Sequence, residues 1–213
     1  IFVPLPWCDV LEIVESENGH GSFSIIGEDI LQLSDSADNL VMKAVRALES
    51  HLGHALPPLD IYLSKRIPTG AGLGGGSADA SFTIKGINDL FGLGLDQTTM
   101  AGIASKVGAD CPFFIYNRPM FVRGIGDEMT PVDAPVLDSL YVVAAKIKGT
   151  EVSTREAYAG VTPQELPEGT DFAEAIKLSP DKWLCGGLSN DFEKSVFPRQ
   201  PKVEELKRWF AEA

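Results

Sequence analysis

Hydrophobic and polar positions alternate in three segments in the first third of the chain, and this pattern predicts strands. Residues 10–14 and 21–26 alternate loosely, and Asn18-Gly19 between them is a strong signal for a hairpin turn. Residues 59–63 alternate in the same way. We therefore expect a hairpin near the start of the sequence and a third strand after it.

Two longer segments have the spacing of amphipathic helices. In residues 40–52, hydrophobic side chains return on one face behind Asn39, a typical N-cap residue. Residues 78–91 place hydrophobic side chains along one face, with Ser77 where the N-cap is expected. A shorter helix is predicted over residues 100–107, where a glycine follows.

The rest of the chain predicts two more strands and then a part richer in helices. Residues 110–116 indicate a buried strand, and residues 120–126 a second strand with a glycine hinge. A composition shift at residues 130–135 marks a domain boundary. Beyond it, residues 140–145 predict a strand, followed by two or three helices. The fold class that follows is α+β.

Composition and charge exclude several classes of protein. The 213 residues are 44% hydrophobic and 23% charged, which is typical of a globular chain. With 18 Lys and Arg against 30 Asp and Glu, the net charge of −12 argues against a nucleic-acid partner or an anionic membrane. The apolar stretches are far shorter than the roughly 20 residues of a membrane span. An acidic chain that binds phosphate must use backbone amides and a few well-placed cations.

The cysteines and histidines do not form a metal or disulfide pattern. Cys8, Cys111 and Cys185 lie in unrelated contexts without a Cys-x-x-Cys motif, so they indicate reduced thiols in a cytoplasmic protein. His51 and His54 have the spacing of a ligand pair, but no third ligand lies nearby in the sequence, which disfavours a metal site there.

The most informative segment is a glycine-rich loop between the strand at 59–63 and the helix at 78–91. Six of the seven residues 70–76 are Gly or Ala. Each glycine inside an ordered element costs about 0.5–1 kcal/mol relative to alanine, so this density needs a reason. We infer that side chains are absent so that a phosphate chain can approach the backbone N–H groups and the positive end of the next helix.

Three other interpretations of this loop fit less well. A Walker loop needs a lysine directly before Ser77, where the chain has Gly76. Gly70, Gly72 and Gly75 match the dinucleotide pattern Gly-x-Gly-x-x-Gly, but the βαβ repeat around that pattern is lacking. A flexible linker is disfavoured by the strand before the loop and the helix after it.

The loop resembles the Pro-x-x-x-Gly-Leu-Gly-Ser-Ser-Ala phosphate loop of the GHMP kinases, the superfamily of galactokinase, homoserine kinase and mevalonate kinase. The loop has three consecutive glycines before Ser77. In this it is similar to the loop of the branch that phosphorylates 4-diphosphocytidyl-2-C-methyl-D-erythritol in the non-mevalonate isoprenoid pathway. Further segments agree with this branch in order and spacing: residues 36–40, 65–68, 93–95, 108–114, 124–127 and 188–192.

The resemblance implies an α+β, GHMP kinase-like two-domain fold. Residues 1–135 would form the N-terminal ATP-binding domain, of the ribosomal protein S5 domain 2-like type, and residues 136–213 a helix-rich α+β C-terminal domain. It also implies an ATP-dependent kinase that uses ATP and Mg²⁺ and acts on a small-molecule cytidine diphosphate alcohol. The alternatives are another GHMP small-molecule kinase and a nucleotide-binding fragment without catalysis. The oligomeric state is left open, a homodimer included.

The resemblance assigns a chemical role to one carboxylate and a binding role to one aromatic residue. Asp110 matches the catalytic aspartate, which contacts the substrate and either accepts or orients the proton of the attacking hydroxyl; its alternative role is a turn or N-cap residue. Tyr158 is similar to an aromatic residue that stacks on the cytosine ring, and its alternative is a core tyrosine.

The remaining implied site residues bind the nucleotide. Asn39 and Lys65 match residues near the nucleotide base, although Asn39 is equally well explained as a helix cap. Ser77 would lie at the phosphate and Mg²⁺ end of the loop. The residues that would wrap the ATP phosphates are Pro68, Thr69, Gly70, Ala71, Gly72, Leu73, Gly74, Gly75, Gly76, Ser77 and Ala78.

Both ends of the sequence look cut, because it begins at Ile1 within a strand-like run and ends within a helical pattern. In the family, an N-terminal segment carries a lysine that pairs with the catalytic aspartate and a Gly-Tyr-His that grips the cytidine. Neither that segment nor the C-terminal glycine motif is present in the sequence. We therefore expect a fragment of a kinase, with unpaired strand edges.

Overall fold

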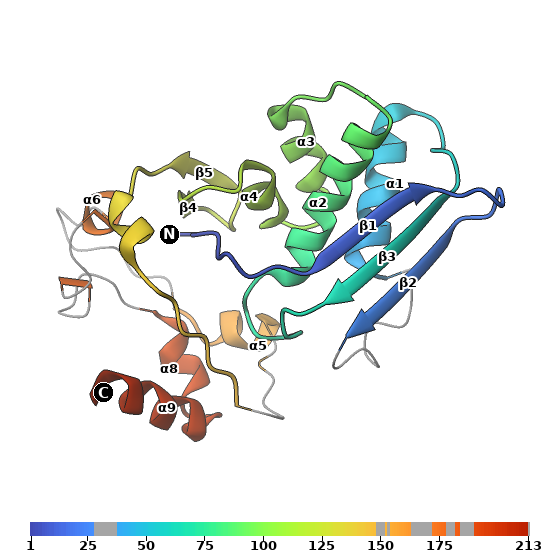
Figure 1. Cartoon of the computed structure of the whole chain (residues 1–213). Coiled ribbons are helices and arrows are strands. Elements are labelled where there is room, and N and C mark those ends of the chain that lie inside the picture. The colour runs from blue at the N-terminus through green and yellow to red at the C-terminus, as the bar shows by residue number, and fades with distance from the viewer. Residues whose placement is uncertain are drawn as a thin grey trace. The chain divides into compact units, whose positions relative to one another are not determined.

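The computed structural model describes residues 1–27, 38–147, 152, 154–162, 172–177, 182–183 and 190–212. The chain divides into two compact units (Figure 1). The first consists of Ile1–Thr69 and Leu73–Val132, and the second of Gly70–Gly72 and Asp133–Ala213.

The first unit is built on a three-stranded sheet with β3 in the middle (Figure 1). Strand β3 (Leu59–Lys65) pairs antiparallel with β1 (Val10–Glu15) and parallel with β2 (Ser22–Gly27). The predicted hairpin of β1 and β2 is therefore wrong, because β3 lies between them. The connection over residues 16–21 is long enough to cross the roughly 10 Å that two strand spacings require, so the turn signal did not fix the pairing.

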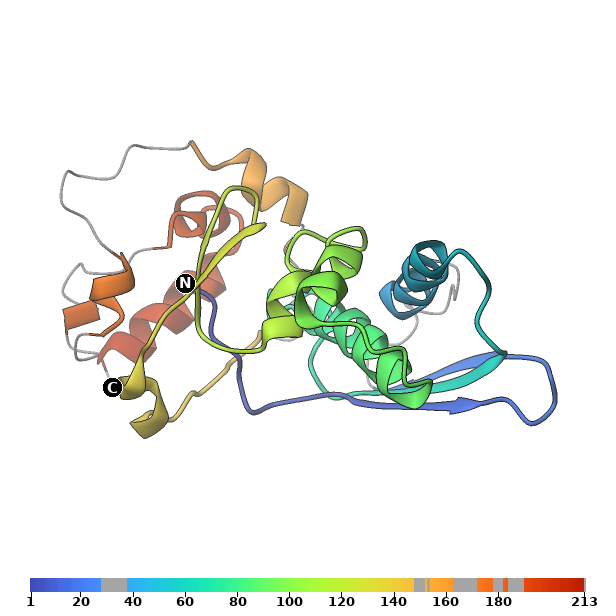
Figure 2. The same ribbon diagram turned by 90° about the horizontal axis from the view of Figure 1, so that it is seen from above.

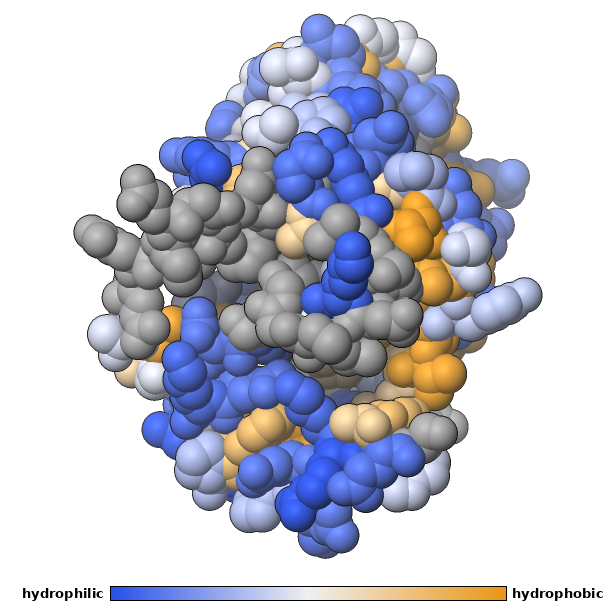
Figure 3. Space-filling view, turned by 90° about the vertical axis from the view of Figure 1, so that its left-hand side faces the viewer, coloured by the Kyte–Doolittle hydropathy of each residue, from blue (hydrophilic) through white to orange (hydrophobic). Residues whose placement is uncertain are grey.

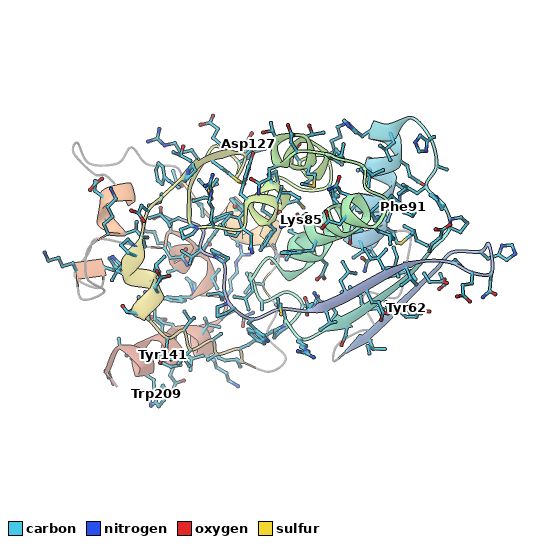
Figure 4. The ribbon with its side chains drawn as sticks, turned by 45° about the horizontal axis from the view of Figure 1, so that its top comes forward. Tyr62, Lys85, Phe91, Asp127, Tyr141 and Trp209 are labelled. Carbon is cyan, nitrogen blue, oxygen red and sulfur yellow. The ribbon has the colours of Figure 1, made fainter. Side chains whose placement is uncertain are left out.

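Two helices cover one face of this sheet, as the two ribbon views show (Figures 1 and 2). They are α1 (Leu40–Leu52) and α2 (Gly75–Leu90), and both were predicted from their hydrophobic spacing. The opposite face of the sheet carries partly exposed hydrophobic side chains, among them Tyr62 (Figure 4). The core between helices and sheet includes the fully buried Leu48, Ile61, Leu63, Ile84, Ile87 and Ile103.

The helix caps confirm one prediction and correct another. Asn39 caps α1 as expected, since its side-chain oxygen accepts a hydrogen bond of 2.9 Å from the N–H of Val41. Helix α2, however, begins at Gly75, so Ser77 is not its N-cap. The cap is Gly74, whose left-handed φ of 68° turns the chain into the helix and places Ser77 inside the first turn.

The segment predicted as a buried strand at 110–116 is a helix, α4 (Cys111–Tyr116). A short apolar run does not distinguish a buried strand from a buried helix by periodicity. Pro112 in the first turn favours a helix start, and Asn117, with a φ of 48°, ends the helix. Helix α3 (Gln97–Ala104) precedes it and begins three residues earlier than predicted, behind Asp96 as N-cap.

A short hairpin completes the first unit. Strand β4 (Met120–Arg123) pairs antiparallel with β5 (Glu128–Pro131). The predicted strand at 120–126 is thus only four residues long, because Gly124 and Gly126 both take positive φ and belong to the turn. Asp127 lies in this turn, where its carboxylate accepts a hydrogen bond from the N–H of Ile125 (Figure 4).

The described part of the second unit contains helices and extended chain. Residues 140–145, where a strand was predicted, have no regular secondary structure, and Tyr141 is 98% exposed. Within the described part of this unit there is no strand with which their backbone groups could pair. Its helical elements are η2 (Pro135–Ser139), α5 (Thr154–Ala159), α6 (Phe172–Ala175), α8 (Phe192–Val196) and α9 (Pro201–Glu212).

Among the residues that Figure 3 shows in colour, most are hydrophilic, and hydrophobic residues form patches between them. Large exposed hydrophobic side chains include Tyr141 and, on α9, Trp209 (Figure 4). Among the helices that the structure describes, none combines the length and the hydrophobicity needed to cross a membrane.

Candidate active site

The glycine loop (residues 68–78) ends in a helix start that is packed too tightly for larger residues. A Cβ atom on Gly74 would lie 2.8 Å from the ring of Phe114, and one on Gly75 would lie 3.0 Å from Ile67. Packing inside the protein therefore favours glycine at positions 74 and 75, whereas a Cβ on Gly72 would meet no atom within 4 Å. The sequence-based explanation, close approach of a ligand, covers only part of the glycine run.

The backbone of the loop also depends on glycine. Gly70, Gly72 and Gly74 have φ values of 65°, 70° and 68°, which alternate with the negative φ of the residues between them. This alternation of sign is the arrangement in which successive N–H groups turn toward one concave side. Such a concave backbone surface binds anions.

The N-terminus of α2 adds further backbone donors. The first intrahelical bond runs from the N–H of Ala78 to the oxygen of Gly74, at 2.9 Å. The N–H groups of Gly75, Gly76 and Ser77 precede it and have no acceptor within the helix. Gly74 has no side chain to cap them. The positive end of a 16-residue helix is thus open to an anionic group.

A carboxylate lies at this helix start. The hydroxyl of Ser77 donates a hydrogen bond of 2.9 Å to Oδ1 of Asp110, and Ser77 itself is buried. Asp110 occupies the N-cap position of α4, but its side chain makes no capping hydrogen bond. Asp110 thus has the position expected of an N-cap residue without capping the helix through its carboxylate, and a role as a turn residue stays open. One carboxylate oxygen is held by Ser77, and the residue is half-buried.

Ser81, on α2, links helices α2 and α4 next to the Ser77–Asp110 pair. Its hydroxyl is 2.9 Å from the backbone oxygen of Ser77 and 2.7 Å from that of Cys111. Burial, with the charge of Asp110 adding to it, raises the pKa of the Cys111 thiol to about 11. Cys111 is consequently neutral at physiological pH and does not compete with Asp110 as a base.

A second charged group lies at the start of α2. The ammonium of Lys65, at the end of β3, bridges the carboxylates of Asp9 and Asp79, the latter at 2.7 Å. The side chains of Lys65, Asp9 and Asp79 are only 6%, 4% and 8% exposed. We call these three residues the ion triad.

The pKa values within the ion triad follow from one ammonium shared by two buried carboxylates. Burial raises the pKa of Asp79 to about 6, against the opposing effect of Lys65. Burial also acts on Asp9, but hydrogen bonds from Lys65, Ile67 and Arg66 outweigh it and leave the pKa of Asp9 below its usual 3.8. The two carboxylates likewise outweigh burial at Lys65 and raise its pKa above 10.5.

The shift at Asp79 predicts a pH dependence of stability. Because its folded pKa is raised from 3.8 to about 6, the folded state binds a proton more tightly than the unfolded state, and stability increases as the pH falls through this window. The shifts of Asp9 and Lys65 act outside it, below about pH 4 and above about pH 10. Asp79→Asn removes this titration, so urea unfolding of the variant should lack this pH dependence. The free energy of unfolding of Asp79→Asn minus that of wild type should therefore be about 1 kcal/mol more positive at pH 7.5 than at pH 5.0. A pH-independent difference between the two proteins would contradict this assignment.

The sequence and structure comparisons agree on one family. Residues 39–118 match the family model described as GHMP kinases N terminal domain. The 4-diphosphocytidyl-2-C-methyl-D-erythritol kinase of Parabacteroides distasonis is 45% identical over 97% of this chain and 72% of its own length. The enzyme of the same name from Bacteroides fragilis is 42% identical over 98% of this chain and 73% of its own.

The chain belongs to the family of 4-diphosphocytidyl-2-C-methyl-D-erythritol kinases.

Solved structures agree with this membership. The fold matches a crystal structure of 4-(cytidine 5'-diphospho)-2C-methyl-D-erythritol kinase with a TM-score of 0.63 and 25% identity, over 93% of this chain and 67% of that one. A mevalonate kinase from Methanococcus jannaschii, at 16% identity and a TM-score of 0.57, shares the fold over 93% of this chain and 69% of its own. The two-domain α+β GHMP kinase fold class expected from the sequence is confirmed.

The remaining predicted site residues of this GHMP kinase lie in different surroundings. Asn39 has its oxygen engaged as the cap of α1. Tyr158, on α5 in the second unit, is 61% exposed and contacts Phe192 edge to face at 4.8 Å, so it is not a core tyrosine. In the described part of the chain there is no group of three His, Cys, Asp or Glu side chains that could hold a metal ion.

The pairing of Lys65 with Asp9 and Asp79 was not predicted from the sequence. Asp79 lies two residues after Ser77, among Gly, Ala and Ser residues of the same helix. A charged residue among such small residues is the one signal in the sequence that could have indicated a buried ion pair. Asp9 lies 56 residues before Lys65, and nothing local in the sequence indicates that pairing.

Proposed function

We propose that this kinase transfers the γ-phosphoryl group of ATP to the 2-hydroxyl of 4-diphosphocytidyl-2-C-methyl-D-erythritol. The observation that carries the proposal is the Asp110 carboxylate, held by Ser77 at the open N-terminus of α2 directly after the glycine loop. A phosphate-binding backbone and a carboxylate beside it are the parts that phosphoryl transfer to an alcohol requires. The names of the relatives supply the substrate.

In this proposal the glycine loop binds the phosphates of ATP. The backbone N–H groups of Gly75, Gly76 and Ser77 point out of the helix start, where the helix dipole favours negative charge. Asn39 and Lys65 are assigned to the neighbourhood of the nucleotide base. The side-chain oxygen of Asn39 is engaged in capping, so its amide N–H₂ group is the part that would contact the base.

Mg²⁺ would be held by the hydroxyl of Ser77 together with phosphate oxygens. The donor set fits this ion, because Mg²⁺ prefers hard oxygen ligands and takes one or two protein groups plus substrate phosphates. A hydroxyl with a carboxylate oxygen 2.9 Å away, next to the phosphate-binding backbone, supplies such ligands. When bound, Mg²⁺ neutralises charge on the β- and γ-phosphates.

Asp110 acts on the attacking alcohol. As the hydroxyl oxygen forms its bond to the γ-phosphorus, the bond from that phosphorus to the bridging oxygen of ADP breaks, and Asp110 accepts the hydroxyl proton. The hydrogen bond from Ser77 to Oδ1 fixes the orientation of the carboxylate and leaves Oδ2 for the substrate. Phosphoryl transfer needs mainly positioning and charge stabilisation, so a single carboxylate suffices as the base.

Tyr158 is proposed to stack on the cytosine ring of the substrate. It is 61% exposed, and its edge-to-face contact with Phe192 steadies the ring while leaving aromatic surface uncovered. Stacking of a base on an aromatic side chain contributes about 1–3 kcal/mol.

Cytidine recognition gives a direct test of the substrate. In the full-length protein, CDP should inhibit competitively against the alcohol substrate, and Tyr158→Ala should raise the KM for that substrate by about 5- to 150-fold, the equivalent of the stacking energy. Tyr158→Phe keeps the ring and serves as the control, with a KM within about twofold of wild type. An absence of any effect of cytidine nucleotides would contradict the proposed substrate and favour a different GHMP kinase activity.

We also assign the protein to the cytoplasm. The support is the state of its described cysteines: Cys8 is exposed and Cys111 is buried, and both are free thiols. Free thiols are typical of a reducing compartment.

A further inference from the structure

The ion triad joins the two ends of the glycine loop. Lys65 is the last residue of β3, just before the loop, and Asp79 lies in the first turns of α2, just after it. Lys65 Nζ donates a hydrogen bond of 2.7 Å to Oδ2 of Asp79, so the residues before and after the loop are in direct contact. Figure 1 shows the end of β3 beside the start of α2.

Asp9, from a third segment of the chain, also binds the residues at the start of the loop. It precedes β1, and its Oδ2 accepts a hydrogen bond from Lys65. Its Oδ1 accepts from the backbone N–H groups of Arg66 and Ile67, at 2.5 and 2.8 Å. One carboxylate therefore holds the two residues between β3 and the loop, Arg66 and Ile67.

The approach of the two loop ends is close on the backbone as well. A Cβ atom on Gly75 would lie 3.0 Å from Ile67 Cγ2 and 3.3 Å from the ammonium nitrogen of Lys65. The ammonium therefore lies directly beside the first residue of α2, at the end of the glycine loop. Two of its three N–H groups are used by Asp9 and Asp79, which fixes the direction of the third.

A buried ion triad is a poor way to gain stability. The desolvation of three charges offsets most of their attraction, and well-packed hydrophobic side chains commonly serve stability equally well. Charged hydrogen bonds, in contrast, are directional and fix geometry. The arrangement at the base of the loop therefore supplies orientation, which phosphate binding needs, at little gain in folding free energy.

We propose that Asp79, with Asp9, is a positioning residue for ATP: it holds Lys65 and both ends of the glycine loop in the geometry that binds the nucleotide. This inference rests on the proposed function, and it assigns the two aspartates no contact with substrate. Their effect passes through Lys65 and the loop backbone.

The test compares Asp79→Asn with wild type in the full-length protein. The variant keeps the shape and a hydrogen-bond acceptor but removes the charge that holds Lys65. We expect the Kd and KM for ATP to rise about tenfold, the usual effect of losing one charged hydrogen bond. The KM for the alcohol substrate and kcat should stay within about twofold, since the reacting groups are untouched. Asp89→Asn, an exposed carboxylate at the opposite end of α2, is the matched control and should change nothing.

A purely structural triad would give a different result. It predicts a lower unfolding midpoint for Asp79→Asn with unchanged ATP affinity, and this result, or a variant that does not fold, would overturn the proposal.

The proposed function can fail separately. The Kd for ATP is measured without the alcohol substrate, so a wild-type protein that binds ATP but does not phosphorylate 4-diphosphocytidyl-2-C-methyl-D-erythritol rejects the proposed substrate alone. A weaker Kd in Asp79→Asn would still support the positioning role.

Discussion

Asp110→Asn should lower kcat by about 10²- to 10⁴-fold, the range that a positioned general base contributes. The amide is close in shape to the carboxylate and still accepts the hydrogen bond from Ser77, so the site keeps its geometry and loses the group that takes the proton. The Kd for ATP should stay within about threefold, because the loss falls on the transition state and not on nucleotide binding. Steady-state kinetics with ATP and the alcohol substrate, together with ATP binding by calorimetry, measure both quantities.

Ser77→Ala and Asp89→Asn are the companions of this experiment. Ser77→Ala removes the hydrogen bond that orients Asp110 and should lower kcat less than Asp110→Asn does. Asp89→Asn, at the far end of α2, should behave as wild type. An Asp110→Asn protein with wild-type kcat would show that Asp110 is a turn residue without a chemical role.

Gly74→Ala should destabilise the protein and impair ATP binding. Alanine at the left-handed φ of 68° costs about 1–2 kcal/mol. Its Cβ would also lie 2.8 Å from the ring of Phe114, and displacing that ring from its contact with Phe113 adds about 1–3 kcal/mol. The sum is a large share of the stability of a small domain. Chemical denaturation and ATP binding by calorimetry check both effects.

Gly72→Ala separates the backbone cost from the packing cost. Gly72 has a similar φ of 70°, but no atom lies within 4 Å of the position its Cβ would take. This variant should lose only the roughly 1–2 kcal/mol of backbone strain. Combining Gly74→Ala with Phe114→Leu should recover part of the packing cost. Equal destabilisation by the two single variants would contradict a role for Phe114.

Local patterns were sufficient for the parts of this fold that local interactions determine. The hydrophobic spacing and the Asn39 cap predicted α1, because both signals lie within one helix. The glycine loop was identified from its composition, whereas Asp110 was assigned from the family resemblance, and the structure joins the two through Ser77.

Long-range pairing accounts for what the sequence did not reveal. The Asn18-Gly19 turn predicted a hairpin, but the insertion of β3 between β1 and β2 depends on a strand more than thirty residues later. The Phe114 and Ile67 contacts that require Gly74 and Gly75 come from other elements. The backbone preference of a glycine does not reveal which side chain from another element will pack against it.

The ion triad shows the same limit for the site. Lys65 was assigned to the nucleotide from its motif, and its two carboxylate partners come from the chain before β1 and from inside α2. Only the folded geometry brings these three charges together, so the pattern around Lys65 could not predict them.

The most direct test of the proposed activity is turnover of ATP by the full-length protein with 4-diphosphocytidyl-2-C-methyl-D-erythritol, beside homoserine and mevalonate as alternative alcohols. We predict formation of ADP and of the 2-phosphorylated product with the cytidine substrate alone. ATP binding without turnover of that substrate, or preferential turnover of homoserine or mevalonate, would contradict the proposed function.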